Sequence, residues 1–289
     1  MLVKKDLEVV PYNPNWPRVF DTEASKIRAA IGEPFSEIHH VGSTAVPGLD
    51  AKPIIDIIAC VKDLNFDAQG LACLGYEYRG GFNLPLRKCF THRSVALSVN
   101  LHVFEKDDPE IELNLLFRDY LRAHPQVRDQ YAALKYQLLE DEASYEKTGV
   151  AMFRDYTLGK YKLIQDILKN TGFSRIRFVI CAHELEWAAA KQFRNTYFFE
   201  PHKTEDPYTW TFEHKDHKHL ILYKGVNIVG YAHVQFLPDN RSALRMIAID
   251  KREQGKGYGG KFISLIEKWL KLEGRGIGFA ASANQRLAL

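Results

Sequence analysis

The sequence predicts a mixed α/β (α+β) protein of two domains, and three observations lead to this class. The chain has 289 residues, close to twice the ~150 residues of a typical domain. Helical patterns alternate with β-branched runs in the first half, and a second group of strands and helices follows. Asn170-Thr-Gly-Phe-Ser174 is a short polar break before a new strand. We therefore expect one domain over residues 1–170 and another over residues 174–289.

Composition excludes several classes of protein. Hydrophobic residues make up 46% of the chain and charged residues 26%, an ordinary globular balance that excludes disorder for most of it. The apolar stretches are short and interrupted, far below the ~20 residues that a membrane-spanning helix needs. The net charge of +3 is too weak to indicate nucleic acid, whose binders concentrate Lys and Arg on one face.

The N-terminus and the cysteines favour a cytoplasmic protein. Charged residues follow the first three positions, and no apolar core with a small-residue cleavage site builds a secretory signal. The four cysteines lie far apart without a C-x-x-C pair, which suits free thiols in a reducing compartment better than disulfides or a zinc site; they are Cys60, Cys73, Cys89 and Cys181.

The first domain is expected to begin with a Pro-punctuated entry and a helix from about Asp21 to Ile31, which stops at Gly32-Glu-Pro34. A short strand, a loop rich in Gly, Ser, Thr and Pro, and a buried β-branched strand follow, over residues 35–41, 42–52 and 53–61. A helix (66–74), two strands (76–78 and 94–104) and a Gly/Pro loop (80–85) continue the pattern. Three helices close the domain; they start at Asp108-Pro109, at His124-Pro125 and near Met152.

The second domain is expected to run from a strand at 177–182 through a helix at 183–197 and an irregular loop at 199–216. Three antiparallel strands linked by tight turns follow, at 218–223, 228–236 and 243–250. A Gly-rich turn then opens a helix at 261–272. This order is the skeleton of a cofactor-binding α/β domain.

The Gly-rich turn Gln254-Gly-Lys-Gly-Tyr-Gly-Gly260 is the strongest functional signal of the second domain. Glycines between a strand and a helix let backbone amides converge on an anion at the helix N-terminus, where the unpaired donors and the dipole favour phosphate. The turn is not a P-loop, because no Gly-Lys-Ser/Thr closes it, and as a Rossmann fingerprint it comes after antiparallel hairpins rather than opening a βαβ unit. A loop without a ligand is the alternative.

In this region the sequence resembles the GNAT N-acetyltransferase family, whose signature Gln/Arg-x-x-Gly-x-Gly/Ala is matched by the segment 254–259. The resemblance extends from about Arg175 to the end and implies acetyl-CoA as cofactor and an amine, small molecule or peptide, as acceptor. By this resemblance the pyrophosphate would lie on the loop and the pantetheine beside the preceding strand. The implied cofactor-binding residues are Ile247, Ile249, Gln254, Gly255, Lys256, Gly257, Tyr258, Gly259, Gly260 and Asn284.

This domain departs from the family in two respects. The chain stops one turn into the helix that follows the last strand, so the domain is expected to be C-terminally short and to lack the family's thiolate-protonating Tyr. Acetyl transfer also needs a group that removes the amine proton. His233 is the best strand-borne candidate; a packed or solvated strand histidine is the alternative.

His214-Lys-Asp-His217-Lys-His219 brings three imidazoles close together in the sequence. The lysines between them would repel a cation and no cysteine is near, so we predict no metal there but a solvated loop that enters a strand.

In the first domain, a Gly-Ser turn precedes a strand that carries one carboxylate, Asp56. Such a turn can bind phosphate with its amides and hydroxyl, and Asp56 could bind Mg²⁺. The alternative is a structural ion pair of Asp56 with a buried Arg or His, because burial of an unpaired carboxylate is costly.

These stretches resemble the GrpB family, which shares a nucleotidyltransferase-like fold. The matching segments lie at residues 10–16, 38–48, 51–57, 100–103 and 117–124. The resemblance implies Gly42 and Ser43 as a phosphate-facing turn, Asp56 as the first metal or substrate carboxylate, and Lys52 and His102 as further substrate-binding residues. Working nucleotidyltransferases use two carboxylates on that strand to hold two Mg²⁺, whereas this chain has Asp56-Ile-Ile58.

Three hypotheses follow. The leading one is a GrpB-like domain that binds a nucleotide or phosphate ligand, fused to an acetyl-CoA-dependent N-acetyltransferase. The second is a non-catalytic ligand-binding or scaffold protein with a degenerate second domain. The third is a nucleotidyltransferase that acts through Asp56.

Overall fold

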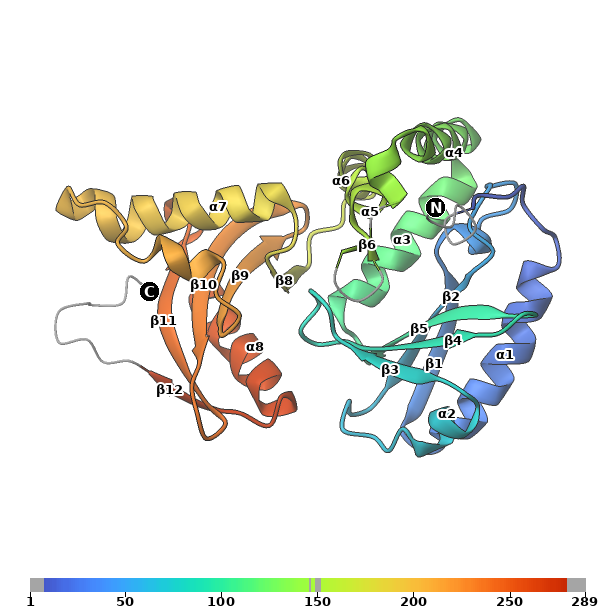
Figure 1. The fold of residues 1–289 in the computed structure, drawn as a ribbon, viewed down its shortest axis with the longest axis horizontal. Coiled ribbons are helices and arrows are strands. Elements are labelled where there is room, and N and C mark those ends of the chain that lie inside the picture. Colours follow the sequence, from blue (N-terminus) through green and yellow to red (C-terminus); the bar gives the residue numbers. More distant parts are fainter. Residues whose placement is uncertain (1–7, 146, 149–151, 280–289) are drawn as a thin grey trace. The chain divides into compact units, whose positions relative to one another are not determined.

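A computed structural model describes residues 8–145, 147–148 and 152–279 of the chain. It divides into two compact units (Figure 1): unit 1 comprises Met1–Gly80 and Arg87–Phe173, and unit 2 comprises Gly81–Leu86 and Ser174–Leu289. The second boundary lies beside the polar break at Asn170. The assignment of Gly81–Leu86 to unit 2 is a feature that the sequence pattern did not indicate.

Unit 1 is built on a five-stranded mixed sheet of order β1-β2-β5-β4-β3. The central pair β2 and β5 is parallel, with Asp56 opposite Asn100 and Ile58 opposite His102, and the other neighbours are antiparallel. The strands are β1 (Phe35–Val41), β2 (Ile55–Val61), β3 (Glu77–Gly80), β4 (Lys88–Arg93) and β5 (Ser98–Glu105).

Six α-helices complete the described part of unit 1: α1 (Trp16–Ile31), α2 (Gln69–Cys73), α3 (Pro109–Ala123), α4 (Pro125–Glu140), α5 (Arg154–Leu158) and α6 (Tyr161–Asn170). Asp108 caps α3 as predicted, since its carboxylate accepts a hydrogen bond from the Glu110 amide at 2.9 Å. A 3-10 turn (Ser43–Ala45) lies between β1 and β2, a second one (Glu142–Tyr145) follows α4, and β6 (Lys147–Thr148) pairs with β7 (Met152–Phe153).

Unit 2 has its own five-stranded sheet, of order β12-β11-β10-β9-β8. Its strands are β8 (Ile176–Ile180), β9 (His217–Lys224), β10 (Asn227–Phe236), β11 (Arg241–Ile249) and β12 (Gly276–Phe279). All neighbours are antiparallel except β11 and β12, which are joined through α8 (Tyr258–Leu272). Its other long helix is α7 (Glu184–Arg194), which continues into a π-helical turn (Asn195–Phe199).

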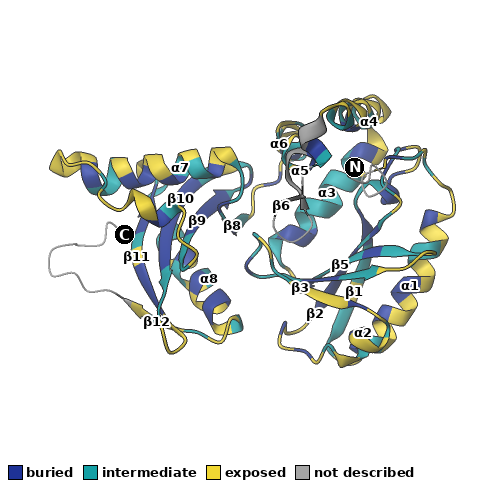
Figure 2. Cartoon of the chain, in the orientation of Figure 1, coloured by how far each residue is buried: buried dark blue, intermediate teal, exposed yellow. Residues whose placement is uncertain are grey.

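The two faces of this second sheet carry separate hydrophobic cores, because side chains alternate along each strand. One core combines Leu220 and Leu222 of β9 with the α8 residues Phe262 and Ile266. The other combines the intervening strand residues, such as Ile221, with residues of α7. Figure 2 shows the middle parts of β9, β10 and β11 as buried and β12 as largely exposed. The mixed α/β class with two mixed sheets is thus confirmed.

Several element boundaries differ from the sequence prediction. Strand β4 was not predicted, because its segment Lys-Cys-Phe-Thr-His-Arg has few β-branched residues and charged ends. The single helix predicted from Met152 to Leu168 is interrupted at Gly159, where α5 ends and α6 follows, as the high helix cost of glycine explains. The helix predicted to start at residue 21 begins at Trp16, with Pro17 in its first turn.

None of the helices in the described ranges is both long and apolar enough to cross a membrane.

Candidate functional sites

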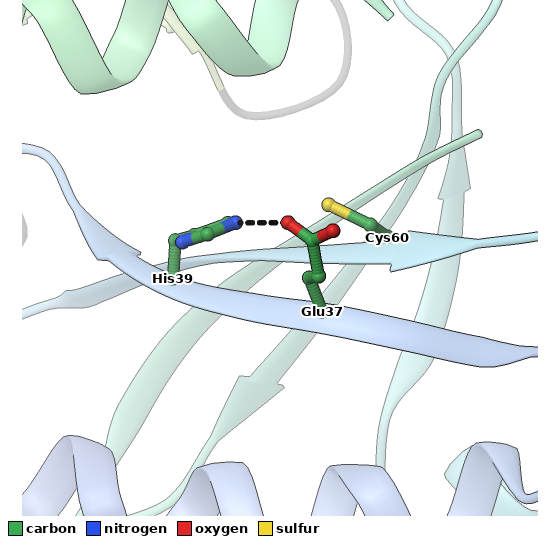
Figure 3. A group of neighbouring side chains, drawn as sticks. All are labelled: Glu37, His39 and Cys60. Carbon is green, nitrogen blue, oxygen red and sulfur yellow. Dashed lines mark ion pairs between the residues drawn. The ribbon is translucent and has the colours of Figure 1, made fainter. Parts of the chain in front are cut away.

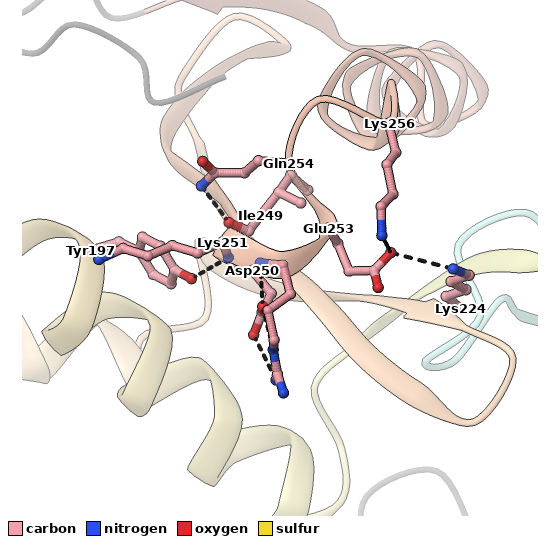
Figure 4. A network of polar contacts seen from close by, with 9 residues as sticks. Tyr197, Lys224, Ile249, Asp250, Lys251, Glu253, Gln254 and Lys256 are labelled. Carbon is pink, nitrogen blue, oxygen red and sulfur yellow. Dashed lines mark hydrogen bonds and ion pairs between the residues drawn. The ribbon is translucent and has the colours of Figure 1, made fainter.

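The Gly-rich turn of unit 2 begins where β11 ends. Asp250 accepts a hydrogen bond from the Arg252 amide at 2.9 Å and so starts a short 3-10 turn over Lys251–Glu253. The Gln254 side chain folds back and donates to the Ile249 carbonyl at 2.8 Å (Figure 4). These two contacts fix the direction in which the chain leaves the strand.

The loop then turns through two glycines in the left-handed region, Gly255 (φ +74°) and Gly257 (φ +80°). Gly257 is the N-cap of α8, and the first helical hydrogen bond runs from the Lys261 amide to the Gly257 carbonyl at 3.1 Å. The amides of Tyr258, Gly259 and Gly260 therefore precede the hydrogen-bonded ladder of the helix. A methyl group at Gly255, Gly257 or Gly260 would meet no atom within 4 Å. The loop thus presents helix N-terminal donors in open space, an arrangement that suits a phosphate.

Neighbouring side chains hold the start of this loop from two sides. The Tyr197 hydroxyl accepts a hydrogen bond from the Lys251 amide at 2.9 Å. Glu253 pairs with Lys256 at 3.2 Å and with Lys224 at 3.3 Å, and the hydrogen bond from Lys256 is the main cause that lowers the pKa of Glu253. Figure 4 shows this network around the turn.

Strand β11 leaves part of one edge open beside the loop. Strand β12 pairs with residues Arg241 to Leu244 only, so within the described ranges the segment from Arg245 to Ile249 has a strand partner on the β10 side alone. The pairing with β10 shifts at Arg245, where Leu244 faces Val234 and Met246 faces His233. The predicted residues Ile247 and Ile249 lie in this segment, their side chains in the core and their backbone at the open edge.

His233, the predicted proton acceptor, lies on β10 and is 3% exposed. Its Nε2 lies 2.7 Å from Nδ1 of His217, and its ring stacks on His219 at 4.5 Å between centroids. Burial is the main cause that lowers the pKa of His233 to about 2, so the ring is neutral at neutral pH. His233 Nε2 is thus in contact with the less buried His217, and His233 Nδ1 is buried and forms no hydrogen bond among the described residues.

The segment 214–219 is a loop that enters a strand, as predicted: His214 and Lys215 are exposed, and β9 begins at His217. His219 is 1% exposed, with Nδ1 2.8 Å from the Tyr231 hydroxyl and Nε2 3.1 Å from the Thr211 carbonyl. Both ring nitrogens are engaged in these contacts. His219 therefore joins β9 and β10 to the 3-10 turn Thr209–Phe212.

In unit 1 the structure brings the predicted Gly-Ser turn and Asp56 together. Gly42 has φ +70°, and a methyl group there would lie 2.4 Å from Asp56 Oδ2. Only glycine leaves room for the carboxylate at this point. The next residue, Ser43, forms a hydrogen bond with the buried Tyr131 hydroxyl.

The Asp56 carboxylate is 29% exposed and receives a hydrogen bond from Asn100 Nδ2 at 2.7 Å. Arg93 donates in turn to the Asn100 side-chain oxygen. His102 Nε2 lies 4.0 Å from Asp56, and His102 Nδ1 accepts from Arg87 at 3.5 Å. Burial and then Arg87 lower the pKa of His102 to about 3, so a charged His102–Asp56 ion pair is not what holds Asp56.

Two lysines complete this site. Lys52 and Lys160 place their Nζ atoms 4.3 and 4.1 Å from the ring centre of Tyr156, which is 1% exposed. Burial lowers the pKa of Lys52 to about 8; burial and the charges of Lys52 and Lys135 lower that of Lys160 to about 7. Burial raises the pKa of Asp56, against the opposing effects of Asn100, Lys160, Arg93 and Lys52. The charged neighbours of Asp56 are therefore cations.

Mg²⁺, which the sequence suggested for Asp56, does not fit this donor set. The ion is held through carboxylates and water, and the positions opposite Asp56 and Ile58 hold Asn100 and His102 rather than a second carboxylate. The surrounding ammonium and guanidinium groups would repel a divalent cation. The same groups suit an anion such as phosphate.

The outcome for the predicted site residues is mixed. Asn284 lies outside the described residues. The sequence missed Asn100, Arg93 and Lys160 in unit 1 and Tyr197 in unit 2. Only the pairing of β5 with β2 on one side and with β4 on the other brings the first two near Asp56, so their own local sequence did not mark them as site residues. For Lys160 the one local signal was the preceding Gly159, a residue that disfavours helix.

Two mixed sheets, each with an anion-suited turn beside a strand, define a two-domain α/β protein. Residues 6–170 match the family described as GrpB protein, and residues 182–287 match the Acetyltransferase (GNAT) family. The chain belongs to the GrpB family and carries a GNAT domain after its GrpB domain.

Individual relatives match the first unit. The UPF0157 protein YqkA of Bacillus subtilis is 38% identical over 139 residues, which are 47% of this chain and 40% of that protein. The glutamate-rich protein GrpB of Alkalihalophilus pseudofirmus is 34% identical over 175 residues, 58% of this chain and 97% of that protein. The crystal structure of GrpB from Enterococcus faecalis has 30% sequence identity and a TM-score of 0.50, and covers 57% of this chain and 96% of that one. The chain thus spans less than half the length of YqkA.

Proposed function

We propose that unit 2 is an acetyl-CoA-dependent N-acetyltransferase that acts on an amine, small molecule or peptide. The observation that carries the proposal is the Gly-rich turn, whose left-handed glycines leave the first amides of α8 in open space. A pyrophosphate on these amides would place the remainder of the cofactor along the open edge of β11. The match to the GNAT family supports this use of the turn.

Acetyl transfer breaks the thioester bond of acetyl-CoA and forms an amide with the acceptor nitrogen, which loses a proton. His233 remains our candidate for that proton, reached through His217, with which it shares a 2.7 Å hydrogen bond. A pKa of about 2 makes His233 a weak base, since a general base works best with a pKa near the operating pH. His233→Ala should therefore lower the rate of acetylation only modestly, without changing acetyl-CoA affinity.

Calorimetric titration of the full chain with acetyl-CoA tests cofactor binding. We expect a saturable heat that Gly257→Glu abolishes, because a carboxylate would occupy the phosphate position. Since Gly257 has φ +80°, a side chain there also strains the backbone, so Lys256→Glu serves as a second variant. Ser264→Glu on the exposed face of α8 adds the same charge away from the turn and should bind like the unchanged chain. Absence of heat from the unchanged chain would favour the scaffold hypothesis.

We further propose that unit 1 binds a phosphate-bearing ligand such as a nucleotide. The supporting observation is the set of cations around a single carboxylate, with Lys52 and Lys160 on one tyrosine ring. Charged hydrogen bonds to phosphate from these groups are each worth about 1.5–3 kcal/mol. The Gly42-Ser43 turn would supply backbone amides to the same ligand.

Titration with ATP and with inorganic pyrophosphate tests this second proposal. Lys52→Met and Lys160→Met should each weaken binding about 10-fold or more, the equivalent of one charged hydrogen bond. Lys162→Met is the matched control, because the Lys162 side chain is 90% exposed and pairs with Asp166. Equal affinities in all three variants would rule out this site. Mg²⁺-dependent release of pyrophosphate from a nucleotide, lost in Asp56→Asn, would instead support the nucleotidyltransferase hypothesis.

A further inference from the structure

A second cluster of unit 1, separate from Asp56, joins three different side chains across β1 and β2. Glu37 and His39 lie two residues apart on β1, and Cys60 of β2 is the register partner of Glu37. Because His40 stacks on Phe20 of α1, its neighbours Glu37 and His39 belong to the opposite face of the sheet. Figure 3 shows the three side chains together on that face.

The donor atoms of this cluster already lie near one another. His39 Nε2 is 3.4 Å from Glu37 Oε2, and one ligand atom from each residue lies within 4.8 Å of the other two. The Cys60 thiol is free and 1% exposed. His39 Nε2 is buried and, among the described residues, forms no hydrogen bond. The pairing of two β-strands does not by itself require that an imidazole nitrogen, a thiol and a carboxylate lie so close together.

These donors match the preferences of one class of ion. Zinc takes thiolate at ~2.3 Å and imidazole or carboxylate at ~2.0–2.2 Å, so the ligands of a tetrahedral site lie about 3.4–3.6 Å apart. The His39–Glu37 pair, at 3.4 Å, already has this spacing, and the thiol must approach the other two ligand atoms from within 4.8 Å. Mg²⁺ and Ca²⁺ prefer oxygen ligands, whereas thiolate together with imidazole selects zinc among the available metals.

We propose that Glu37, His39 and Cys60 form a Zn²⁺ site with three protein ligands and a fourth position for water. On binding, the Cys60 S–H bond is replaced by a sulfur–zinc bond and the proton passes to solvent. Glu37 is half exposed, so the ion has a path from solvent to a buried sulfur. The site ties β1 to β2 on the face opposite α1.

Lys106 tunes this site. Its Nζ lies 3.6 Å from Glu37 Oε1 and its side chain is 56% exposed, so it competes with a cation for the carboxylate. Lys106→Gln removes that competitor without touching a ligand. We expect the Lys106→Gln chain to bind zinc more tightly than the unchanged chain.

Titration of the reduced, metal-free full chain with Co²⁺, followed by competition with Zn²⁺, tests the site. Co²⁺ on a thiolate gives a sulfur-to-cobalt absorption band that histidine or carboxylate alone does not produce. We expect one equivalent of Co²⁺ to develop this band and Zn²⁺ to remove it. Cys60→Ser should abolish the band, and His39→Gln should weaken binding by more than the roughly 10- to 100-fold that changes outside the ligand sphere cost.

Cys73→Ser is the matched control, because Cys73 is an exposed free thiol of the same unit. Its band and affinity should equal those of the unchanged chain. The proposal is overturned if no thiolate band develops, if the band persists in Cys60→Ser, or if it disappears in Cys73→Ser. Should Cys60→Ser fail to fold by circular dichroism, His39→Gln decides: unchanged affinity in that variant also overturns the site.

Discussion

At the scale of single residues, the Asp56 site shows what a sequence can and cannot indicate. Gly42, Ser43 and Asp56 were predicted as a unit, since the loop and the strand are close in sequence and the structure places Asp56 directly on Gly42. Asn100 donates to the Asp56 carboxylate and Arg93 donates to the Asn100 side-chain oxygen, and strand pairing alone brings these two residues there. The electrostatic character of the site, in which cations surround Asp56, depends on those distant partners, so the sequence alone could not weigh Mg²⁺ against an anion there.

The lowered pKa of Lys160 predicts how the stability of unit 1 depends on pH. Its pKa is about 7 in the folded chain against an ordinary value of 10.5, so between these limits Lys160 binds fewer protons in the folded than in the unfolded chain. The free energy of unfolding should therefore rise as the pH increases from 7 to 9. Lys160→Met removes this contribution and should flatten the rise.

Urea unfolding of the unchanged chain and of Lys160→Met at several pH values measures how the free energy of unfolding changes with pH. Lys52 adds a smaller contribution of the same sign, because its pKa is lowered to about 8, so some rise should persist in the variant. Lys162→Met, at a position where the side chain is 90% exposed, should keep the slope of the unchanged chain. If the free energy of unfolding of Lys160→Met rises with pH as steeply as that of the unchanged chain, Lys160 does not cause the pH dependence.

At the scale of elements, the antiparallel strands and the helix after the Gly-rich turn were predicted nearly to the residue, because turns and apolar periods mark them locally. The π-helical turn Asn195–Phe199 after α7 was not predicted. It places Tyr197 against the start of the Gly-rich turn, where the hydroxyl accepts from the Lys251 amide. A local change in helix geometry thus connects α7 with the candidate cofactor loop.

Tyr197→Phe should test this connection. Loss of one neutral hydrogen bond costs about 1 kcal/mol, so we expect acetyl-CoA to bind about fivefold more weakly, while the fold of unit 2 is kept. Calorimetric titration measures the affinity, and Tyr208→Phe is the control because that ring is 50% exposed. If Tyr197→Phe binds acetyl-CoA as the unchanged chain does, Tyr197 does not position the loop.

At the scale of the whole molecule, the sequence indicated a division near Asn170 but not the second segment of unit 2. The sequence predicted a loop at residues 80–85 because this stretch holds Gly and Pro, and the segment Gly81–Leu86 has neither helix nor strand in the structure. Its assignment to unit 2 rests on packing: the Asn83 carbonyl accepts from the Ile180 amide at 2.9 Å, and Leu84 and Leu86 pack on the two cores of that unit. Contacts between residues this far apart in the sequence produce no periodic pattern within the segment itself, so the sequence could not predict them.

The packing of this segment gives the prediction for the whole chain. Because the Leu84 side chain is partly buried against the core that includes α7, Leu84→Ser should lower the free energy of unfolding of unit 2 by ~1–2 kcal/mol, somewhat below the value for a fully buried leucine. Tryptophan fluorescence in denaturant reports this transition selectively, since Trp187, Trp210 and Trp269 lie in unit 2 and Trp16 alone in unit 1.

Val95→Ser in unit 1, where the side chain is fully exposed, should leave that transition unchanged. A fragment that begins at Ser174, the division suggested by the sequence, would lack the whole segment and should unfold at lower denaturant than unit 2 does in the full chain. An equally stable fragment together with an unaffected Leu84→Ser chain would show that the segment contributes nothing to unit 2. The reverse result would mean that the GNAT domain of this chain is completed by residues from within the GrpB sequence, so that neither domain can be exchanged as a contiguous piece.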